Sequence, residues 1–242
     1  MPAETLDPTF DFRTDTPPGK DPDSHSPTLR RYHRQLWSKP LPDGRDFTLE
    51  PHGSMDYLLH ESAAVGRFTL SSDAAFADWN GIARMAKVQP HVEQATIDAF
   101  VQTSYTMGGM MLWPANKIDN KLTINGARGL KGRIADRMDL TMEAVRRHYE
   151  GGDSPLADVF ERYGAFFDLF GDFDGFVEFW LLEDMLDCDG GVAFHAHFDD
   201  YETMGYPTSP SEYLDYLAQA GAAIEARGRR MAEWVEGRPS TA

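Results

Sequence analysis

Apolar residues recur at helical spacing through much of the second half of the chain. After a Ser-Pro pair at positions 154–155, a typical helix start, such residues lie three and four positions apart until Gly171. A second apolar set predicts another helix over residues 176–185. The residues that define the first of these helices are Leu156, Val159, Phe160, Tyr163, Phe167 and Phe170.

A capping box marks the start of the last helix. Ser209 and Glu212 have the spacing at which the serine accepts from the backbone at Glu212 and the glutamate reaches back. The helix is expected to run to about Glu236, with a buried stripe formed by Leu217, Ala220, Ile224, Met231 and Trp234. Between the helices, residues 192–198 alternate as a strand would.

The first half mixes short strands with helices. Strands are expected at residues 47–50, 57–60 and 67–70, and helices at residues 73–87 and 92–102. The apolar segment 103–113 reads as a buried strand whose two glycines at 108–109 allow a close backbone approach. These elements predict a single α+β domain, with a small, mainly antiparallel sheet and a predominantly helical second half.

Length and composition set the domain organisation. The 242 residues are 41% apolar, which is enough for one sizeable core over residues 27–242. Residues 1–26 contain five prolines and few large apolar groups, so an extended N-terminal arm is expected. One cysteine, Cys188, and the lack of a signal sequence or a long apolar run favour a cytoplasmic, non-membrane protein. No feature indicates an oligomeric state.

Positive charge is concentrated in two segments of an acidic chain. The net charge is −16, yet 14 of the 23 Lys and Arg residues lie within residues 20–45 and 117–147. This balance argues against non-specific binding of duplex nucleic acid, which needs many phosphate contacts. Cations gathered in this way suit a small anionic ligand.

The first basic segment predicts a ligand clamp on one helix face. On a helix over Pro27–Trp37, Arg30, Arg34 and Trp37 share a face, and Lys39 follows. The guanidinium groups would hold a phosphate while the indole stacks on a ring. Alternatively, the arginines pair with the acidic segment 150–189 and stabilise the fold.

The second basic segment interleaves cations with glycines. Gly126, Gly129 and Gly132 alternate with Arg128, Lys131 and Arg133, and Arg137 follows, which suits a backbone nest for phosphate at a helix start. The spacing matches neither the P-loop nor the dinucleotide fingerprint. The alternative is a solvated, glycine-rich connection.

Asp136 is the first candidate for a general base, because it adjoins these cations, which are expected to keep it ionised. Asp139 is expected to cap a helix, and Tyr105 to line the pocket wall. His195 and His197 have a spacing that could serve one metal ion in a strand. The pair alone does not make a site, and no metal or cofactor is expected.

Several strings also resemble those of one family. They are Asp-Phe-Arg at 11–13 and, further along, SPTLRRYHR, LWSKPLPDG, LSSD, YTMGG, TINGARG and IADRMDLTME. With them the chain resembles a bacterial family, also found in phages, that is catalogued as a domain of unknown function. The resemblance runs from about Asp11 to about Arg230 and implies one compact unit with no known activity.

Together these features predict a protein that binds, and could turn over, a phosphate-bearing small molecule such as a nucleotide. The competing hypothesis is a non-enzymatic interaction or regulatory protein whose basic segments dock to acidic partners. A ligand site requires both basic segments to meet in one concave pocket, whereas a docking surface requires them to be flat and exposed.

Overall fold

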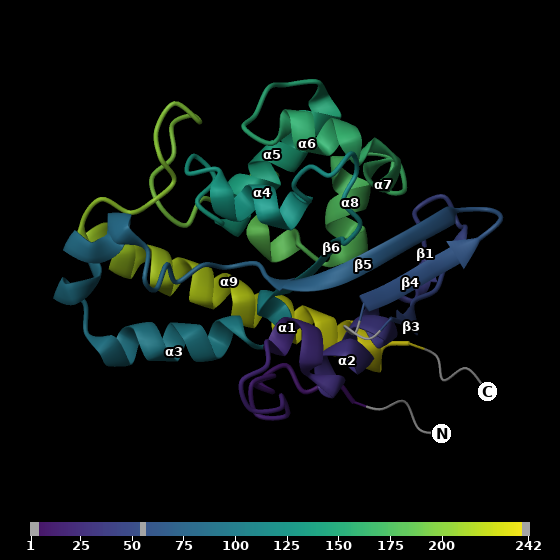
Figure 1. The fold of residues 1–242 in the computed structure, drawn as a ribbon, viewed down its shortest axis with the longest axis horizontal. Coiled ribbons are helices and arrows are strands. Elements are labelled where there is room, and N and C mark those ends of the chain that lie inside the picture. The colour runs from purple at the N-terminus through teal and green to yellow at the C-terminus, as the bar shows by residue number, and fades with distance from the viewer. Residues whose placement is uncertain (1–4, 54–56, 239–242) are drawn as a thin grey trace.

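A computed structural model describes residues 5–53 and 57–238. An antiparallel sheet extends to one side of a long C-terminal helix, and shorter helices pack above and below that helix (Figure 1). The α-helices are α1 (Pro22–His25), α2 (Pro27–Trp37), α3 (Gln94–Ser104), α4 (Ile124–Leu130), α5 (Met138–Glu150), α6 (Ala157–Arg162), α7 (Gly164–Phe167), α8 (Phe173–Trp180) and α9 (Pro210–Glu236). Within the described ranges, no helix is both long and apolar enough to cross a membrane.

The main sheet is antiparallel throughout. Its strands lie in the order β3 (Glu50–His52), β4 (Tyr57–Ser62), β5 (Gly66–Ala74) and β6 (Met110–Pro114). The long strand β5 pairs with β6 over Leu70–Ala74, so that Asp73 stands opposite Met111 at the end of the sheet. A separate two-stranded sheet joins β1 (Lys39–Pro40) to β2 (Asp46–Phe47). This confirms the α+β class and the small antiparallel sheet.

The long helix α9 is the axis of the molecule. Its N-cap Ser209 accepts a hydrogen bond from the amide of Glu212, as the capping box predicts. The Glu212 carboxylate reaches back to Thr208 rather than to Ser209. Helix α9 packs against α3, α2 and the 3₁₀ turn η3 (Met107–Gly109), which precedes β6.

The close backbone approach expected at residues 108–109 is confirmed. A Cβ atom on Gly108 would lie 2.0 Å from the Ile224 carbonyl oxygen of α9, and one on Gly109 would lie 2.1 Å from that of Ser104. Any side chain at either position would therefore push η3 away from the helices.

Several helices confirm the hydrophobic pattern. The first basic helix spans Pro27–Trp37 as predicted, and α3 and α8 lie close to the expected ranges. The long helix expected from residue 155 to Gly171 is instead divided into α6 and α7 by a break at Tyr163, just before Gly164. Glycine is a weak helix former, and the apolar face continues across the break because both pieces pack on one core.

Other predictions were wrong for tertiary reasons. Residues 73–87 form no α-helix: Asp73 and Ala74 belong to β5, and only Ala83–Lys87 make a 3₁₀ turn, η1. Pairing with β6 therefore overrides the local helical spacing. Residues 192–198 form one isolated bridge, Leu186 to Val192, and no strand. The glycine-rich segment forms helix α4, with Thr123 as its N-cap, instead of an open nest.

The N-terminal segment packs against the domain. Over the described residues 5–26 it has little regular structure, in keeping with its prolines, but Leu6 and Phe12 are buried in the core. The Phe12 amide donates to the carbonyl of Tyr105, at 3.1 Å. The short helix α1 then lies alongside β5.

Arg227 of α9 is fully buried and ties three segments together. Its guanidinium donates to the carbonyl oxygens of Gly108 and Met110 at 2.9 and 2.8 Å, and to those of Trp180 and Leu181 at 3.0 and 3.1 Å. The last two carbonyls end α8, where the helix dipole favours a cation. Burial lowers the pKa of Arg227 to about 9, opposed by Glu183 and Asp184, so it stays protonated at neutral pH.

We expect Arg227→Met to destabilise the protein by at least about 3 kcal/mol, because four buried carbonyl oxygens would lose their donor. Urea unfolding followed by tryptophan fluorescence measures the change. Arg229→Met is the matched control, since that side chain lies two positions away on α9 and is 62% exposed. Equal unfolding midpoints for the two variants would contradict the role assigned to Arg227.

Candidate functional site

The first basic segment is used mostly for packing. Arg34 donates to the carbonyl of Leu49 and to the carboxylate of Glu50, at 3.0 and 2.6 Å, and Arg30 is half-buried on the same helix. Trp37 is fully buried and donates to His33. Its ring packs against Phe179 and Trp180, which leaves no ring face for the ligand stacking that the sequence suggested.

The second basic segment is largely neutralised by neighbours. Lys131 contacts the carbonyl of Pro155 and the carboxylate of Asp158, the latter at 2.8 Å. Arg137 is buried and binds the Asp139 carboxylate at 2.5 and 3.0 Å. The N-cap of α5 is Arg137, and not Asp139 as the sequence predicted. Asp139 instead lies in the first turn of the helix, where it pairs with Arg137. Arg133 is exposed.

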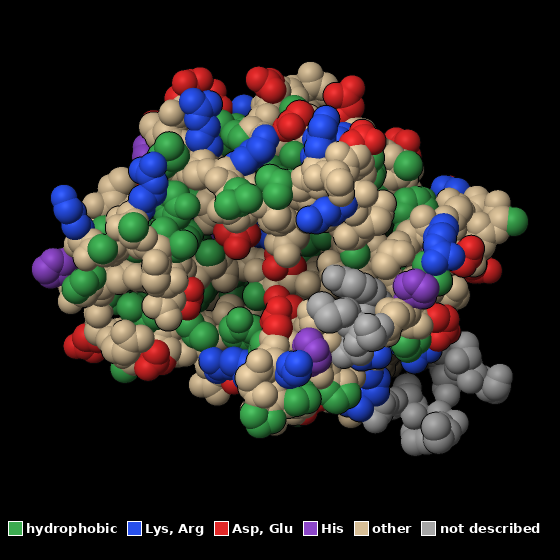
Figure 2. All heavy atoms as spheres, viewed as in Figure 1, with side chains coloured by type: hydrophobic (Ala, Val, Ile, Leu, Met, Phe, Trp, Pro, Cys, Tyr) green, Lys and Arg blue, Asp and Glu red, His purple; other side chains and the backbone are tan. Residues whose placement is uncertain are grey.

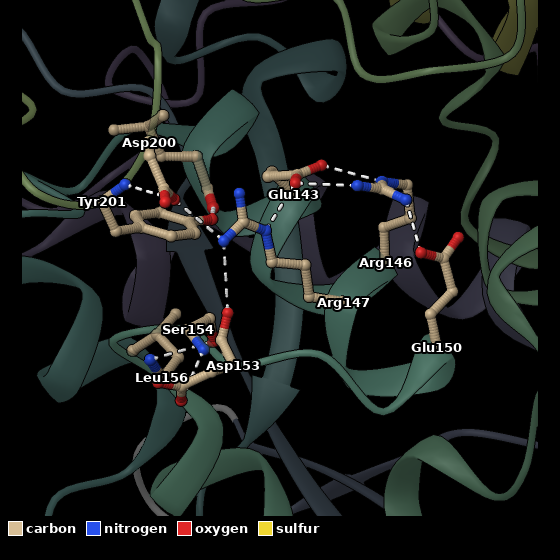
Figure 3. A network of polar contacts seen from close by, with 10 residues as sticks. Glu143, Arg146, Arg147, Glu150, Asp153, Ser154, Leu156, Asp200 and Tyr201 are labelled. Atoms are coloured by element: carbon tan, nitrogen blue, oxygen red, sulfur yellow. Dashed lines mark hydrogen bonds and ion pairs between the residues drawn. The ribbon is translucent and has the colours of Figure 1, made fainter.

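The end of this segment forms an ion-pair network, drawn in Figure 3. Glu143 accepts from both Arg146 and Arg147, and Arg146 also reaches Glu150. Arg147 extends to Asp200 at 2.9 Å. Basic residues of this segment thus pair with acids of the fold, whereas the sequence suggested such pairing only for the first basic segment.

The cavity that both segments reach is lined by their acids rather than by their cations. It has a volume of about 470 Å³ and lies where α1, the end of β5, the α4–α5 connection and the segment before α9 meet. We call it the aspartate cleft, after its lining residues Asp21, Asp23, Asp73, Asp78 and Asp136. Figure 2 shows acidic side chains around a hollow near the middle of one face.

Arg128 lies behind this cleft, where it is fully buried. Its guanidinium binds the carboxylate of Asp73 at 2.7 Å and lies 3.4 Å from that of Asp136. It also donates to the Thr141 hydroxyl and to the carbonyl of Ala75, both at 2.8 Å. The guanidinium is thus a fixed structural cation that holds two aspartates next to each other, and it cannot turn toward an external anion without breaking these bonds.

Two carboxylate oxygens of the aspartates that line the cleft accept no hydrogen bond. Asp23 accepts from the Ala74 amide through one oxygen, while its other oxygen is buried without a hydrogen bond. One oxygen of Asp136, Oδ1, is also buried without a hydrogen bond, although the same oxygen lies 3.4 Å from the Arg128 guanidinium. A buried acceptor without a donor costs free energy, so both positions favour a ligand that donates hydrogen bonds.

The electrostatics of the cleft favour the protonated acids. Burial and repulsion from Asp21 raise the pKa of Asp23 to about 6, despite the Ala74 amide, and Asp136 adds to the repulsion. Burial also raises the pKa values of Asp73 and Asp136, although Arg128 opposes both shifts. The expectation that cations keep Asp136 readily ionised is therefore wrong, because loss of hydration outweighs the single guanidinium.

Strained backbone surrounds the same cavity. Trp79, Ala135 and Asp136 are not glycine, yet they have left-handed φ angles of 56°, 52° and 58°. The Trp79 indole donates to the Ala135 carbonyl at 2.6 Å, which ties the two strained segments together. Such conformations concentrate at functional sites, where the surrounding structure maintains them.

Two tyrosines form the half-buried part of the wall. Tyr105, expected at a pocket wall, lines the aspartate cleft together with Tyr206. Burial and the charges of Asp23 and Asp21 raise the pKa of Tyr105 to about 12, so its hydroxyl stays protonated. The two rings already attract cations, since Arg13 lies over Tyr105 and Arg84 over Tyr206.

The two histidines considered as metal ligands are placed differently from each other. His195 is buried between Phe76 and Tyr216, whereas the side chain of His197 is 74% exposed beside Asp199. The strand that would have turned both rings to one side does not form. In the part of the chain that the structure describes, no three His, Cys, Asp or Glu residues are grouped to hold a metal ion.

Of the site residues predicted from sequence, the structure brings Tyr105, Arg128 and Asp136 together. It adds Asp23 and Asp73, which sequence reasoning missed as site residues. Asp73 was assigned to a helix start and Asp23 to the N-terminal arm. Asp73 follows the predicted strand 67–70 by three positions, and an extension of that strand would have placed it at the end of the sheet, whereas no local pattern marks Asp23.

We expect Asp23→Asn to stabilise the unliganded protein at pH 7.5 by on the order of 2 kcal/mol. The pKa of Asp23 is raised in the folded state, so its protonation stabilises the folded protein. This contribution to the free energy of unfolding is complete below about pH 4 and is lost as the pH rises through about 6. An asparagine has no such loss and can still accept from the Ala74 amide.

Urea unfolding at pH 4 and pH 7.5 measures this difference. The Asp23→Asn variant should be more stable than the unmodified protein at pH 7.5 and equally stable at pH 4. The control is Asp46→Asn, which makes the same change of charge at an exposed position. A gain that is equal at both pH values would contradict the titration assigned to Asp23.

Comparisons with known proteins give a family but no activity. No curated protein and no solved structure matches the chain. Residues 6–231 match the model of a family described as Family of unknown function (DUF6994). This span contains the sheet, all the residues of the aspartate cleft and nearly all of α9, and it agrees with the resemblance found in the sequence. The chain therefore belongs to the family of unknown function DUF6994.

Proposed function

We propose that the protein binds a small organic cation, one with amino or guanidino groups, in the aspartate cleft. The observation that carries this proposal is that Asp23 and Asp136, which line one cavity, each have a buried carboxylate oxygen that accepts no hydrogen bond. An ammonium or guanidinium group would supply hydrogen bonds to both oxygens and offset the negative charge that raises their pKa values.

The walls of the cleft support the same class of ligand. Tyr105 and Tyr206 provide half-buried aromatic rings, which attract cations through their faces. A cavity of about 470 Å³ suits a small molecule. The net charge of −16 adds a long-range attraction for cations, which raises their rate of encounter.

A phosphate-bearing ligand, which the sequence suggested, is less well supported by this geometry. Arg34, Lys131 and Arg137 each contact a carboxylate of the fold, and Arg128 contacts two. An anion in the cleft would face Asp23, Asp73 and Asp136 at close range, where repulsion is strongest. In this proposal Asp136 keeps a place in the site as a ligand-binding carboxylate.

We expect diamines or guanidines, such as putrescine, spermidine or agmatine, to raise the melting temperature at pH 7.5, whereas nucleotides and sugar phosphates should not. Isothermal titration calorimetry then gives the affinity. Binding should weaken about tenfold between pH 7.5 and pH 5, because protonation of Asp23, with its pKa of about 6, removes one charged acceptor.

Two variants make the experiment specific to the cleft. Asp136→Asn, which suits the left-handed backbone there, should weaken binding about ten- to a hundredfold, because a charge-assisted hydrogen bond becomes a neutral one. Asp46→Asn should leave the affinity unchanged. Stabilisation by phosphates alone, or equal affinities for these two variants, would refute a cation site in the cleft.

A further inference from the structure

A second cavity, which shares no lining residue with the aspartate cleft, contains a lysine surrounded by aromatic rings. It has a volume of about 680 Å³ and lies between β1, the end of α8, the 3₁₀ turn η4 (Glu183–Met185) and the last turns of α9. Lys39 lines it together with apolar residues, among them Leu41, Phe179 and Trp234.

Aromatic rings hold the amine of Lys39 in place. Its Nζ atom lies 4.6 Å from the ring centre of Trp234, 4.7 Å from that of Phe179 and 5.2 Å from that of Trp37. These rings come from α9, α8 and α2, so the amine is fixed where three helices meet. Among the described residues, no carboxylate lies within ion-pair distance of this amine, in contrast to Lys131.

The charged groups around Lys39 leave its proton weakly held. Burial, together with the cations Arg238 and Arg227, lowers the pKa of Lys39 to about 7, while Glu183 and Glu178 oppose this shift. Arg230 and Glu233 of α9 also line the cavity. The rings favour the ammonium form, but at a pKa of about 7 about half of the amine is neutral at neutral pH.

We propose that Lys39 is a nucleophilic amine that captures small aldehydes or ketones in this cavity as an imine. A lysine that lies against aromatic rings and beside other cations is a suitable nucleophile, because its neutral form is populated without a strong base. The apolar walls formed by Pro40, Leu41 and Phe179 favour a carbonyl compound with a short hydrocarbon chain.

The chemistry balances without an added reactant. The Nζ lone pair forms a bond to the carbonyl carbon, and the carbonyl oxygen takes up a proton as the nitrogen loses one. The resulting carbinolamine then loses water as the C=N bond forms, with no oxidation or reduction. Glu178, Glu183 and Glu233 line the cavity and are positioned to exchange these protons.

Reductive trapping tests this proposal. The full chain is treated at pH 7 with limiting butanal and sodium cyanoborohydride, and peptide mapping by mass spectrometry locates the alkylated amines. We expect Lys39 to be labelled at least tenfold faster than the exposed Lys87, with a rate that rises through about pH 7. Ordinary lysines, with pKa values near 10.4, are largely protonated in this range.

Two controls keep the outcome decisive. Lys39→Met should abolish the fast labelling while Lys87→Met leaves it unchanged, and labelling in 8 M urea should make Lys39 and Lys87 equivalent. Native labelling of Lys39 that is no faster than that of Lys87 would overturn the proposal and leave Lys39 as a structural cation among aromatic rings. Binding to the aspartate cleft is a separate measurement and does not bear on this result.

Discussion

The fold depends on buried guanidinium groups that must find acceptors inside the protein. Arg227 joins α9 to η3, β6 and the end of α8 through four backbone carbonyls. Arg128 joins α4 to the end of β5, and Arg137 joins the start of α5 to the carbonyls of Ala196 and Gly205. A buried arginine is tolerated only when its donors are satisfied, so each of these residues fixes the relative positions of segments far apart in sequence.

This use of arginine explains why several of the gathered cations are paired with acceptors of the fold. The guanidinium of Arg128 is held by Asp73 and neutral oxygens, and its second carboxylate neighbour, Asp136, has a buried oxygen without a hydrogen-bond donor. The cleft thus combines a structural cation with more negative charge than that cation offsets. Together with the left-handed backbone at Trp79, Ala135 and Asp136, it is a place where the fold tolerates strain and poor solvation that a ligand could relieve.

The aspartate cleft and the Lys39 cavity are opposite cases of one physical effect. Burial shifts acids and bases toward their neutral forms, which raises the pKa of Asp23 and lowers that of Lys39 toward neutrality. In the cleft the shift accompanies carboxylate oxygens, on Asp23 and Asp136, that accept no hydrogen bond. In the Lys39 cavity the same shift leaves the amine partly neutral, which is the basis of the proposed reaction, and the aromatic rings around it provide no carboxylate to pair with it.

The sequence by itself determined the helices with strong apolar periodicity and the α+β class, because these depend on residues close together in the chain. The glycines at 108–109 also indicated a close backbone approach, but only the fold supplied Ile224 as the partner of Gly108. The sequence also identified Tyr105, Arg128 and Asp136 as candidates. Only the tertiary structure decided that residues 73–74 extend a strand, since their partners lie about forty positions later. It alone brought Asp23 to Ala74 and Asp73 to Arg128, and so gave the cleft its negative charge. Local patterns carry no record of contacts across such separations, and the pKa of a side chain is set by the neighbours that the fold supplies.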